Sequence, residues 1–232
     1  TSRIAADLHA RGVGPRARVG CVLTNTPEAC CSALAVWLLG GIVASLPIIS
    51  RGMGVDEYRL RLRTLCERHE IPWVLSERRF ASFLEPAVVP LAYEELGREA
   101  KVPWEPPGAD DVAFVQFSSG STHDPRGCSL TVRAIEAQLA MLREALELDR
   151  GRDRGLMWLP LSHDMGFFGG LLLFWSSGVS GFISQPERFL SSPRSWIEDC
   201  SRFQATLTVA PDSAVALAAR ATWSRGSAEC RA

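Results

Sequence analysis

Short apolar runs alternate with helical patterns along almost the whole chain. Runs typical of buried strands stand at residues 18–24, 41–46, 73–75, 112–117, 155–159, 179–183 and 206–209. The helical patterns between them lie at residues 27–39, 56–69, 132–146, 165–175, 195–203 and 211–220. This rhythm is typical of mixed, mostly parallel sheets that helices cover on both faces. The sequence therefore predicts an α/β protein.

A proline-rich connector interrupts this rhythm. At 232 residues the chain has room for one large domain or two small ones. Residues 86–108 have a weaker pattern and end in VPWEPPGADD, which is typical of a subdomain boundary. We therefore expect a first α/β portion at residues 1–105, a second at 106–220, and an irregular tail at 221–232.

The charge balance, the apolar runs and the cysteine spacing argue against a nucleic-acid-binding protein, a membrane span and a disulfide or zinc framework. The 25 basic and 26 acidic residues leave a net charge of −1, so no overall positive field favours nucleic acid. The apolar run at residues 29–49 is interrupted by Gly40, Gly41 and Pro47, which favours a buried helix and strand over a membrane span. Seven cysteines without a CxxC pair indicate reduced thiols in a cytoplasmic protein.

A candidate phosphate-binding loop lies in residues 114–130, FVQFSSGSTHDPRGCSL, where an apolar strand runs into small hydroxyl residues around a glycine. Backbone N–H and hydroxyl groups in such a loop can donate to phosphate oxygens, and an arginine can add a charge-assisted contact. The order fits neither the Walker A loop nor the dinucleotide GxGxxG. An unliganded Ser/Gly surface loop is the alternative. The candidate ligand-binding residues are Ser118, Ser119, Gly120, Ser121, Thr122, Arg126 and Gly127.

A second candidate site follows the strand at 155–159, in the segment WLPLSHDMGFFGGLL, residues 158–172. Open α/β sheets bind ligands beyond the carboxyl ends of their strands, which is where this segment stands. We therefore predict substrate binding by His163, Asp164, Met165 and Gly166, with His163 as the catalytic candidate. A helix-capping role for Asp164 and an ordinary histidine at a helix start are the alternatives.

Together these segments resemble the signatures of the adenylate-forming (AMP-binding, acyl-activating) superfamily. The first resembles the loop Ser/Thr-Ser-Gly-Ser/Thr-Thr-Gly followed by x-Pro-Lys-Gly, with His123 at a usual glycine and Arg126 at the usual lysine. The second is most similar to Trp-Leu-Pro-x-x-His-Asp-Met-Gly-x-x-Gly of fatty-acyl-AMP ligases and related acyl-CoA synthetases. The resemblance covers most of residues 1–220 and implies the layered αβα N-terminal domain of that family, in incomplete form.

This resemblance also implies a reaction. It implies ATP-dependent activation of a carboxylic acid, preferably a fatty acid, to acyl-AMP, for transfer to the thiol of CoA or of an acyl carrier protein. ATP and Mg²⁺ are the implied cofactors, and the neutral imidazole of His163 would orient the substrate carboxylate. An amino-acid or aryl-acid adenylation domain is one alternative. The family's later motifs for Mg²⁺, ribose and the catalytic lysine are not in these residues, so no metal ligand is assigned. A catalytically incompetent fragment or pseudoenzyme that at most binds nucleotide is therefore the other alternative.

Overall fold

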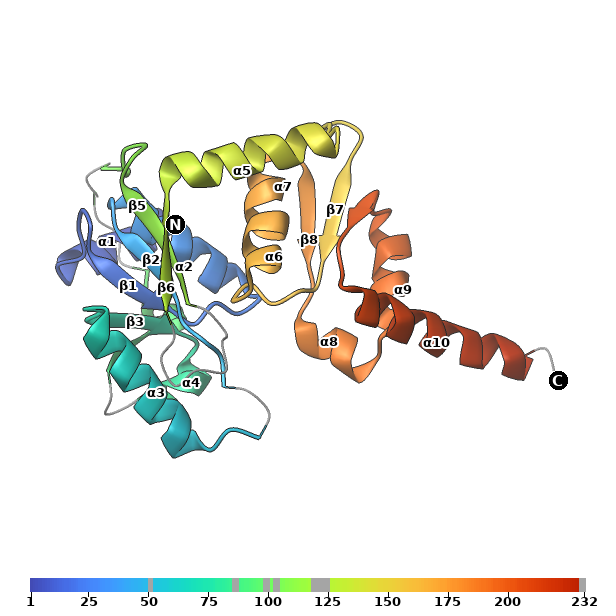
Figure 1. Ribbon diagram of the computed structural model, residues 1–232, viewed down its shortest axis with the longest axis horizontal. Helices are drawn as coiled ribbons and strands as arrows, with labels where there is room; N and C mark the ends of the chain where they lie inside the picture. Colours follow the sequence, from blue (N-terminus) through green and yellow to red (C-terminus); the bar gives the residue numbers. More distant parts are fainter. Residues whose placement is uncertain (50–51, 85–87, 98–100, 102–104, 118–125, 230–232) are drawn as a thin grey trace. The chain divides into compact units, whose positions relative to one another are not determined.

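The chain divides into two compact units, residues 1–136 and 137–232, and each contains its own sheet. The computed structural model shown in Figure 1 describes all residues except 50–51, 85–87, 98–100, 102–104, 118–125 and 230–232. The prediction of an α/β protein with helices on mostly parallel sheets is confirmed.

The first unit is built on a six-stranded sheet in the order β4-β3-β1-β2-β5-β6. Every neighbouring pair is parallel except β5–β6, which is antiparallel. Its elements are α1 (Ser2–Ala10), β1 (Arg18–Cys21), α2 (Pro27–Leu38), β2 (Ile42–Ser45), α3 (Val55–Arg68), β3 (Trp73–Ser76), α4 (Arg78–Leu84), β4 (Val89–Ala92), the 3-10 turn η1 (Tyr93–Glu95), β5 (Val112–Phe117) and β6 (Gly127–Thr131). The helix α5 (Val132–Ala145) follows β6 directly.

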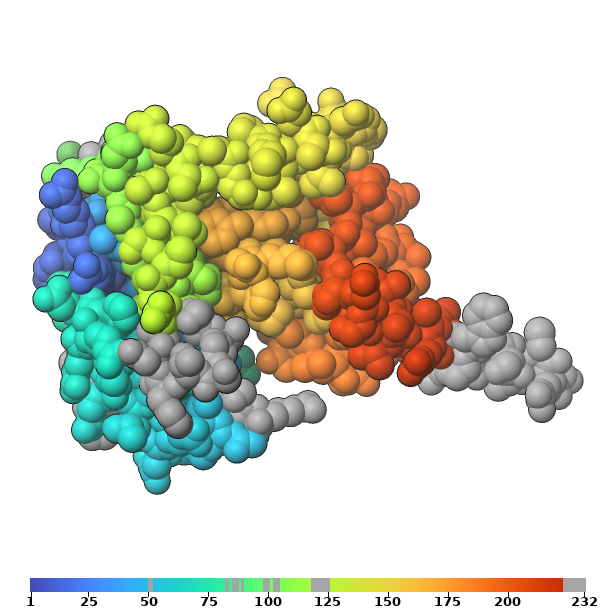
Figure 2. Space-filling view, in the orientation of Figure 1, coloured from blue at the N-terminus to red at the C-terminus, as the bar shows by residue number. Residues whose placement is uncertain are grey.

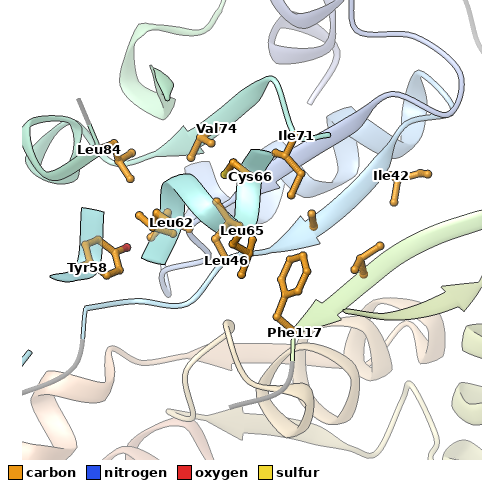
Figure 3. Packing of buried hydrophobic residues seen from close by; sticks show 13 residues of the cluster. Ile42, Leu46, Tyr58, Leu62, Leu65, Cys66, Ile71, Val74, Leu84 and Phe117 are labelled. Carbon is orange, nitrogen blue, oxygen red and sulfur yellow. The ribbon is translucent and has the colours of Figure 1, made fainter. Parts of the chain in front are cut away.

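One face of this sheet packs against α3 (Figure 3). Because successive side chains of a strand point to opposite faces, Ala44 of β2 and Val115 and Phe117 of β5 share one side. Side chains spaced three or four positions apart on α3 meet them, since these positions line one stripe of a helix. The buried residues of this stripe are Tyr58, Leu62, Leu65 and Cys66. Full burial of one such side chain contributes roughly 1.5–3 kcal/mol to folding.

The helix α2 begins as its sequence predicts. The hydroxyl of Thr26 accepts a hydrogen bond from the N–H of Ala29 at 3.2 Å, and Pro27 occupies the first helical turn. At its other end, Trp37 donates from Nε1 to the carbonyl of Ala113 at 2.7 Å. This hydrogen bond joins α2 to β5, the strand that leads into the candidate phosphate-binding loop.

The second unit holds a three-stranded parallel sheet in the order β8-β7-β9. Phe174 packs across this sheet against Gly155 and Gly181, where a Cβ would overlap its ring. The elements are β7 (Arg154–Met157), α6 (Asp164–Gly166), the π-helix η2 (Phe167–Leu172), α7 (Leu173–Ser177), β8 (Ser180–Ile183), α8 (Pro186–Ser191), α9 (Arg194–Phe203), β9 (Leu207–Thr208) and α10 (Asp212–Glu229). The described part of α10 lies on the surface of this unit (Figure 2).

The structure differs from the sequence prediction at several places. The boundary between compact units lies after Glu136 and not near residue 105, because β5 and β6 pair with the first sheet. The helix expected at residues 165–175 is a π-helix in its middle. The helix α10 continues to Glu229, where an irregular tail was expected from residue 221, since Ala, Ser, Arg and Glu there are compatible with a helix. Among the described residues, no helix is both long and apolar enough to cross a membrane.

Candidate functional site

The predicted phosphate-binding loop connects two neighbouring strands. Phe117, the last residue of β5, is the register partner of Gly127, the first residue of β6. The loop therefore starts at the carboxyl end of a parallel strand, the edge at which open sheets bind ligands. The predicted residues Ser118, Ser119, Gly120, Ser121 and Thr122, and also His123, lie outside the described residues. Arg126 is exposed beside them.

Gly127 is closely packed under two aromatic rings. A Cβ at this position would lie 3.1 Å from Phe117 Cε1, 3.1 Å from Val115 Cγ1 and 3.3 Å from His69 Cε1. The His69 and Phe117 rings are in contact, with centroids 4.8 Å apart. The signature glycine at this position thus has a packing reason: it lets β6 approach the rings that cover the end of β5.

The second candidate segment forms a tight turn after β7, the central strand of its sheet. The carbonyl of Pro160 accepts a hydrogen bond from the N–H of His163 at 3.0 Å, and the carbonyl of His163 accepts from the N–H of Phe167 at 2.9 Å. A Cβ on Gly166 would overlap the carbonyl oxygen of Pro160. The glycine therefore allows the first turn of α6 to pack directly on the turn before it, which places His163 at the helix N-cap.

The imidazole of His163 is held by its neighbour. Its Nδ1 lies 2.6 Å from Oδ1 of Asp164, and both side chains are 68% exposed. The same carboxylate oxygen accepts the N–H of Met165 at 2.6 Å. Asp164 is thus the first residue of α6 and holds the ring of His163. The predicted alternative, in which Asp164 caps the helix, is limited to its hydrogen bond with the N–H of Met165. With Nδ1 engaged, Nε2 is the ring atom available to a ligand.

The glycines after this pair have different surroundings. Gly170 packs against the side chain of Met157 on β7, and a Cβ there would overlap its sulfur. A Cβ on Gly169 would meet nothing closer than Cγ of Met165 at 3.9 Å. The π-helix η2 contains both glycines, and π-helical turns in proteins often occur at functional sites. Met165, two residues after His163, is exposed, and its side chain is the nearest neighbour of the open space at Gly169.

An aromatic cluster supports the start of this segment, and the sequence analysis did not include it among the site residues. Trp158 stacks on Phe189 of α8, with centroids 3.7 Å apart and planes 10° apart. Trp196 of α9 meets the Trp158 ring edge-on at 6.3 Å and donates from Nε1 to Thr208 Oγ1 at 2.9 Å. A signal for α8 was present, since Pro186 followed by Glu187 is typical of a helix N-terminus.

The described residues do not fit an Mg²⁺ site. No group of three or more His, Cys, Asp or Glu side chains in that part of the chain could hold a metal ion. The carboxylate oxygen of Asp164 nearest to His163 is already engaged by two partners. Mg²⁺ prefers several oxygen ligands in octahedral geometry, which a single engaged carboxylate does not provide.

A family model described as AMP-binding enzyme matches residues 1–226. The chain belongs to this family. A long-chain-fatty-acid–AMP ligase of Mycolicibacterium smegmatis is 33% identical over 131 residues, which are 53% of this chain and 20% of that ligase. A medium-chain-fatty-acid–[acyl-carrier-protein] ligase of Teredinibacter turnerae is 32% identical over 111 residues, which are 48% of this chain and 17% of that ligase.

The fold of this AMP-binding family member is also that of solved relatives. A structure from a study of fatty acyl-adenylate ligases from E. coli and L. pneumophila superposes with a TM-score of 0.80 at 26% identity. The superposition covers 92% of this chain and 39% of that one. The chain thus spans less than half the length of these relatives, and it has the fold of the N-terminal part of adenylate-forming enzymes.

Proposed function

We propose that this protein activates a carboxylic acid, preferably a fatty acid, by forming an acyl-adenylate from ATP. The observation that carries the proposal is the turn after β7, which presents His163 at the carboxyl end of the central strand with its ring held by Asp164. Membership of the AMP-binding family supports ATP as the second substrate.

In the proposed reaction a carboxylate oxygen of the acid attacks the α-phosphorus of ATP. A new oxygen–phosphorus bond forms, and the bond from the α-phosphorus to the bridging oxygen breaks, so that pyrophosphate leaves with the electron pair. The products are acyl-AMP and pyrophosphate. Such a transfer depends on holding the two reacting groups in line, and this positioning is what the protein's own residues can supply.

His163 would hold the acid through Nε2. Because Nδ1 faces the Asp164 carboxylate, a neutral ring with its proton on Nδ1 would present a lone pair from Nε2 to the substrate carboxylate. A doubly protonated ring can donate from Nδ1 to Asp164 and from Nε2 to the substrate at the same time. Orientation of the acid by His163 therefore requires a hydrogen bond between Nε2 and the substrate carboxylate.

The ATP phosphates would bind at the loop between β5 and β6. We assign them to Ser118, Ser119, Gly120, Ser121 and Thr122, with a charge-assisted contact from Arg126 and close backbone approach at Gly127. The adjacency of Phe117 and Gly127 supports this assignment, since it sets both ends of the loop at one sheet edge. Arginine in place of a lysine keeps the positive charge and offers a planar pair of donors to phosphate.

An aliphatic acid fits the surroundings of His163 better than an amino acid does. Met165 is 41% exposed next to His163, and Gly169 leaves open space on the same helix. An amino acid would need a carboxylate for its ammonium group, and at Asp164 only Oδ2 is left for it, because Oδ1 already accepts from His163 and Met165. The thiol acceptor would be CoA or the phosphopantetheine of an acyl carrier protein. The likeness to an acyl-carrier-protein ligase supports the latter.

Acid-dependent exchange of pyrophosphate into ATP tests this function. We expect exchange with octanoate or dodecanoate and none with phenylalanine or benzoate. Exchange that depends on phenylalanine or benzoate would move the assignment to an amino-acid or aryl-acid adenylation domain. Calorimetric binding of ATP without exchange for any acid would support the non-catalytic alternative.

A further inference from the structure

Trp158 stacks on Phe189 and lies a few residues before His163 in the chain. We propose that Phe189 is a positioning residue for His163 and acts through Trp158. This inference rests on the proposed function for the role of His163 in holding the acid. The positioning of His163 by Phe189 follows from contacts within the second unit.

The Trp158 ring is oriented by stacking on Phe189, with Trp196 at its edge. The two rings are nearly parallel at 3.7 Å, and the exposed fractions of Trp158 and Phe189 are 7% and 3%. The buried Nε1 of Trp158 has no hydrogen-bond acceptor among the residues that the structure describes. Trp196 differs, because its Nε1 donates to Thr208 and fixes that ring by a hydrogen bond. Without a polar tether, the Trp158 ring is oriented by packing alone.

Phe189 is itself held rigidly on α8. The guanidinium of its neighbour Arg188 makes two hydrogen bonds of 2.9 Å to the carboxylate of Asp199 on α9. The carbonyl of Arg188 accepts a further hydrogen bond from Ser195 Oγ at 3.2 Å. A paired, bidentate contact of this kind fixes geometry as well as charge. The Phe189 ring is therefore a firm support against which Trp158 rests.

A short stretch of chain carries the position of Trp158 to His163. Leu159 and Leu161 are buried on either side of Pro160, whose carbonyl accepts the His163 N–H and packs on Gly166. Close-packed interiors transmit small displacements, so a tilt of the Trp158 ring would move the Pro160 carbonyl and with it the helix start. Misplacement of a reacting group by about 1 Å can reduce a rate about a hundredfold. A small displacement of His163 through this stack would therefore affect the reaction.

Two variants and a matched control test the proposal. Phe189→Leu removes the aromatic face, whereas Phe189→Tyr keeps it. Phe203→Leu is the control, because Phe203 stacks on Phe182 in the same unit with centroids 4.2 Å apart and does not belong to the cluster of Trp158, Phe189 and Trp196. Thermal unfolding of each variant establishes that it folds. If Phe189→Leu does not fold, Phe189→Met takes its place, because it also removes the ring and has an unbranched side chain that adapts to the space.

The direct readout is the imidazole Cε1–Hε1 cross-peak of His163 in a proton–carbon NMR spectrum, assigned by its loss in His163→Gln. We expect Phe189→Leu to shift and broaden this cross-peak while the His9 cross-peak stays in place. We expect Phe189→Tyr and Phe203→Leu to leave both unchanged. An unmoved His163 cross-peak in folded Phe189→Leu, or an equal shift in Phe203→Leu, would overturn the proposal.

The second readout is the affinity for dodecanoyl-sulfamoyl-adenosine, a non-hydrolysable acyl-adenylate mimic. Phe189→Leu should weaken its binding roughly tenfold and leave ATP affinity unchanged, whereas Phe189→Tyr should bind within about twofold of the wild type. Equal losses in Phe189→Leu and Phe203→Leu would show a general effect of stability and contradict a positioning role. If the wild type binds no mimic, the proposed function fails, and the NMR comparison alone decides on the positioning of His163.

Discussion

Nδ1 of His163 lies 2.6 Å from Oδ1 of Asp164, and this contact decides which edge of the imidazole faces a ligand. The N–H of Met165 donates to the same carboxylate oxygen at 2.6 Å and helps to hold it in place. The ring is thereby oriented before any substrate binds. Little entropy is then lost when the ring positions a reacting carboxylate.

Removal of the Asp164 carboxylate should therefore impair acid binding more than nucleotide binding. In Asp164→Ala the imidazole loses its orienting partner, and we expect KM for dodecanoate in pyrophosphate exchange to rise about tenfold or more while KM for ATP changes less than about twofold. Glu198→Ala is the matched control, since Glu198 is an exposed acidic residue of the same unit, paired with Arg194. A similar rise in KM for dodecanoate in both variants would contradict the orienting role.

Two glycines of the same helical segment provide a paired test of packing. Gly166→Ala places a Cβ on the Pro160 carbonyl and should lower the free energy of unfolding by about 2 kcal/mol or more. Gly169→Ala meets no atom within 3.9 Å and should leave stability equal or slightly higher, by up to about 1 kcal/mol, since alanine favours helix. Urea denaturation measures both. Equal effects of the two substitutions would show that the turn does not have the close packing described.

Nucleotide binding should depend on the packing under Gly127. Gly127→Ala would place a Cβ 3.1–3.3 Å from side-chain atoms of Phe117, Val115 and His69, so these side chains or the start of β6 must shift slightly to make room. We expect the Kd for ATP, measured by calorimetry, to rise several-fold, while Gly54→Ala, at a site with no atom within 4 Å, leaves it unchanged. An unchanged ATP affinity in folded Gly127→Ala would show that the packing at this glycine does not affect phosphate binding.

Acid should destabilise the second unit through Asp153. Hydrogen bonds from the Arg152 side chain, from the N–H of Asp149 and from the hydroxyl of Thr206 lower the pKa of Asp153 from 3.8 to about 2. Because the pKa is depressed in the folded state, its contribution to stability is complete above about pH 4 and is lost as the pH falls toward 2. Asp153→Asn should lower the Tm at pH 6 and flatten the fall in Tm between pH 4 and 2. A wild-type acid dependence retained in full by this variant would contradict the assignment.

The sequence patterns predicted those helices and strands in which buried positions recur at a regular spacing. The strand β5 has the predicted bounds 112–117, and the stripe of Tyr58, Leu62 and Leu65 on α3 is buried as its spacing indicates. The edge strand β6 was missed, because its residues are mostly exposed and lack an alternating pattern. Its pairing with β5 also places both strands in the first sheet, so the weak pattern at residues 86–108 did not mark the division between units.

The candidate site was predictable only in its signature residues. His163 and Asp164 stand in one motif, and the structure brings them into contact. The stacking of Trp158 on Phe189 joins residues far apart in the sequence, and no pattern within a short window reports such a pair. The π-helix depends likewise on tertiary packing, since Gly170 faces Met157 of a different element.

The proposed activity is the joining of a fatty acid to AMP with the help of His163. Incubation with dodecanoate and ATP labelled at the α-phosphate, followed by separation of the products, measures this directly. We predict labelled dodecanoyl-AMP from the wild-type protein and a yield lower by about tenfold or more from His163→Gln, at unchanged ATP affinity. Absence of labelled dodecanoyl-AMP from a protein that binds both ATP and dodecanoate would rule out the proposed activity, and an equal yield from His163→Gln would rule out the proposed role of His163.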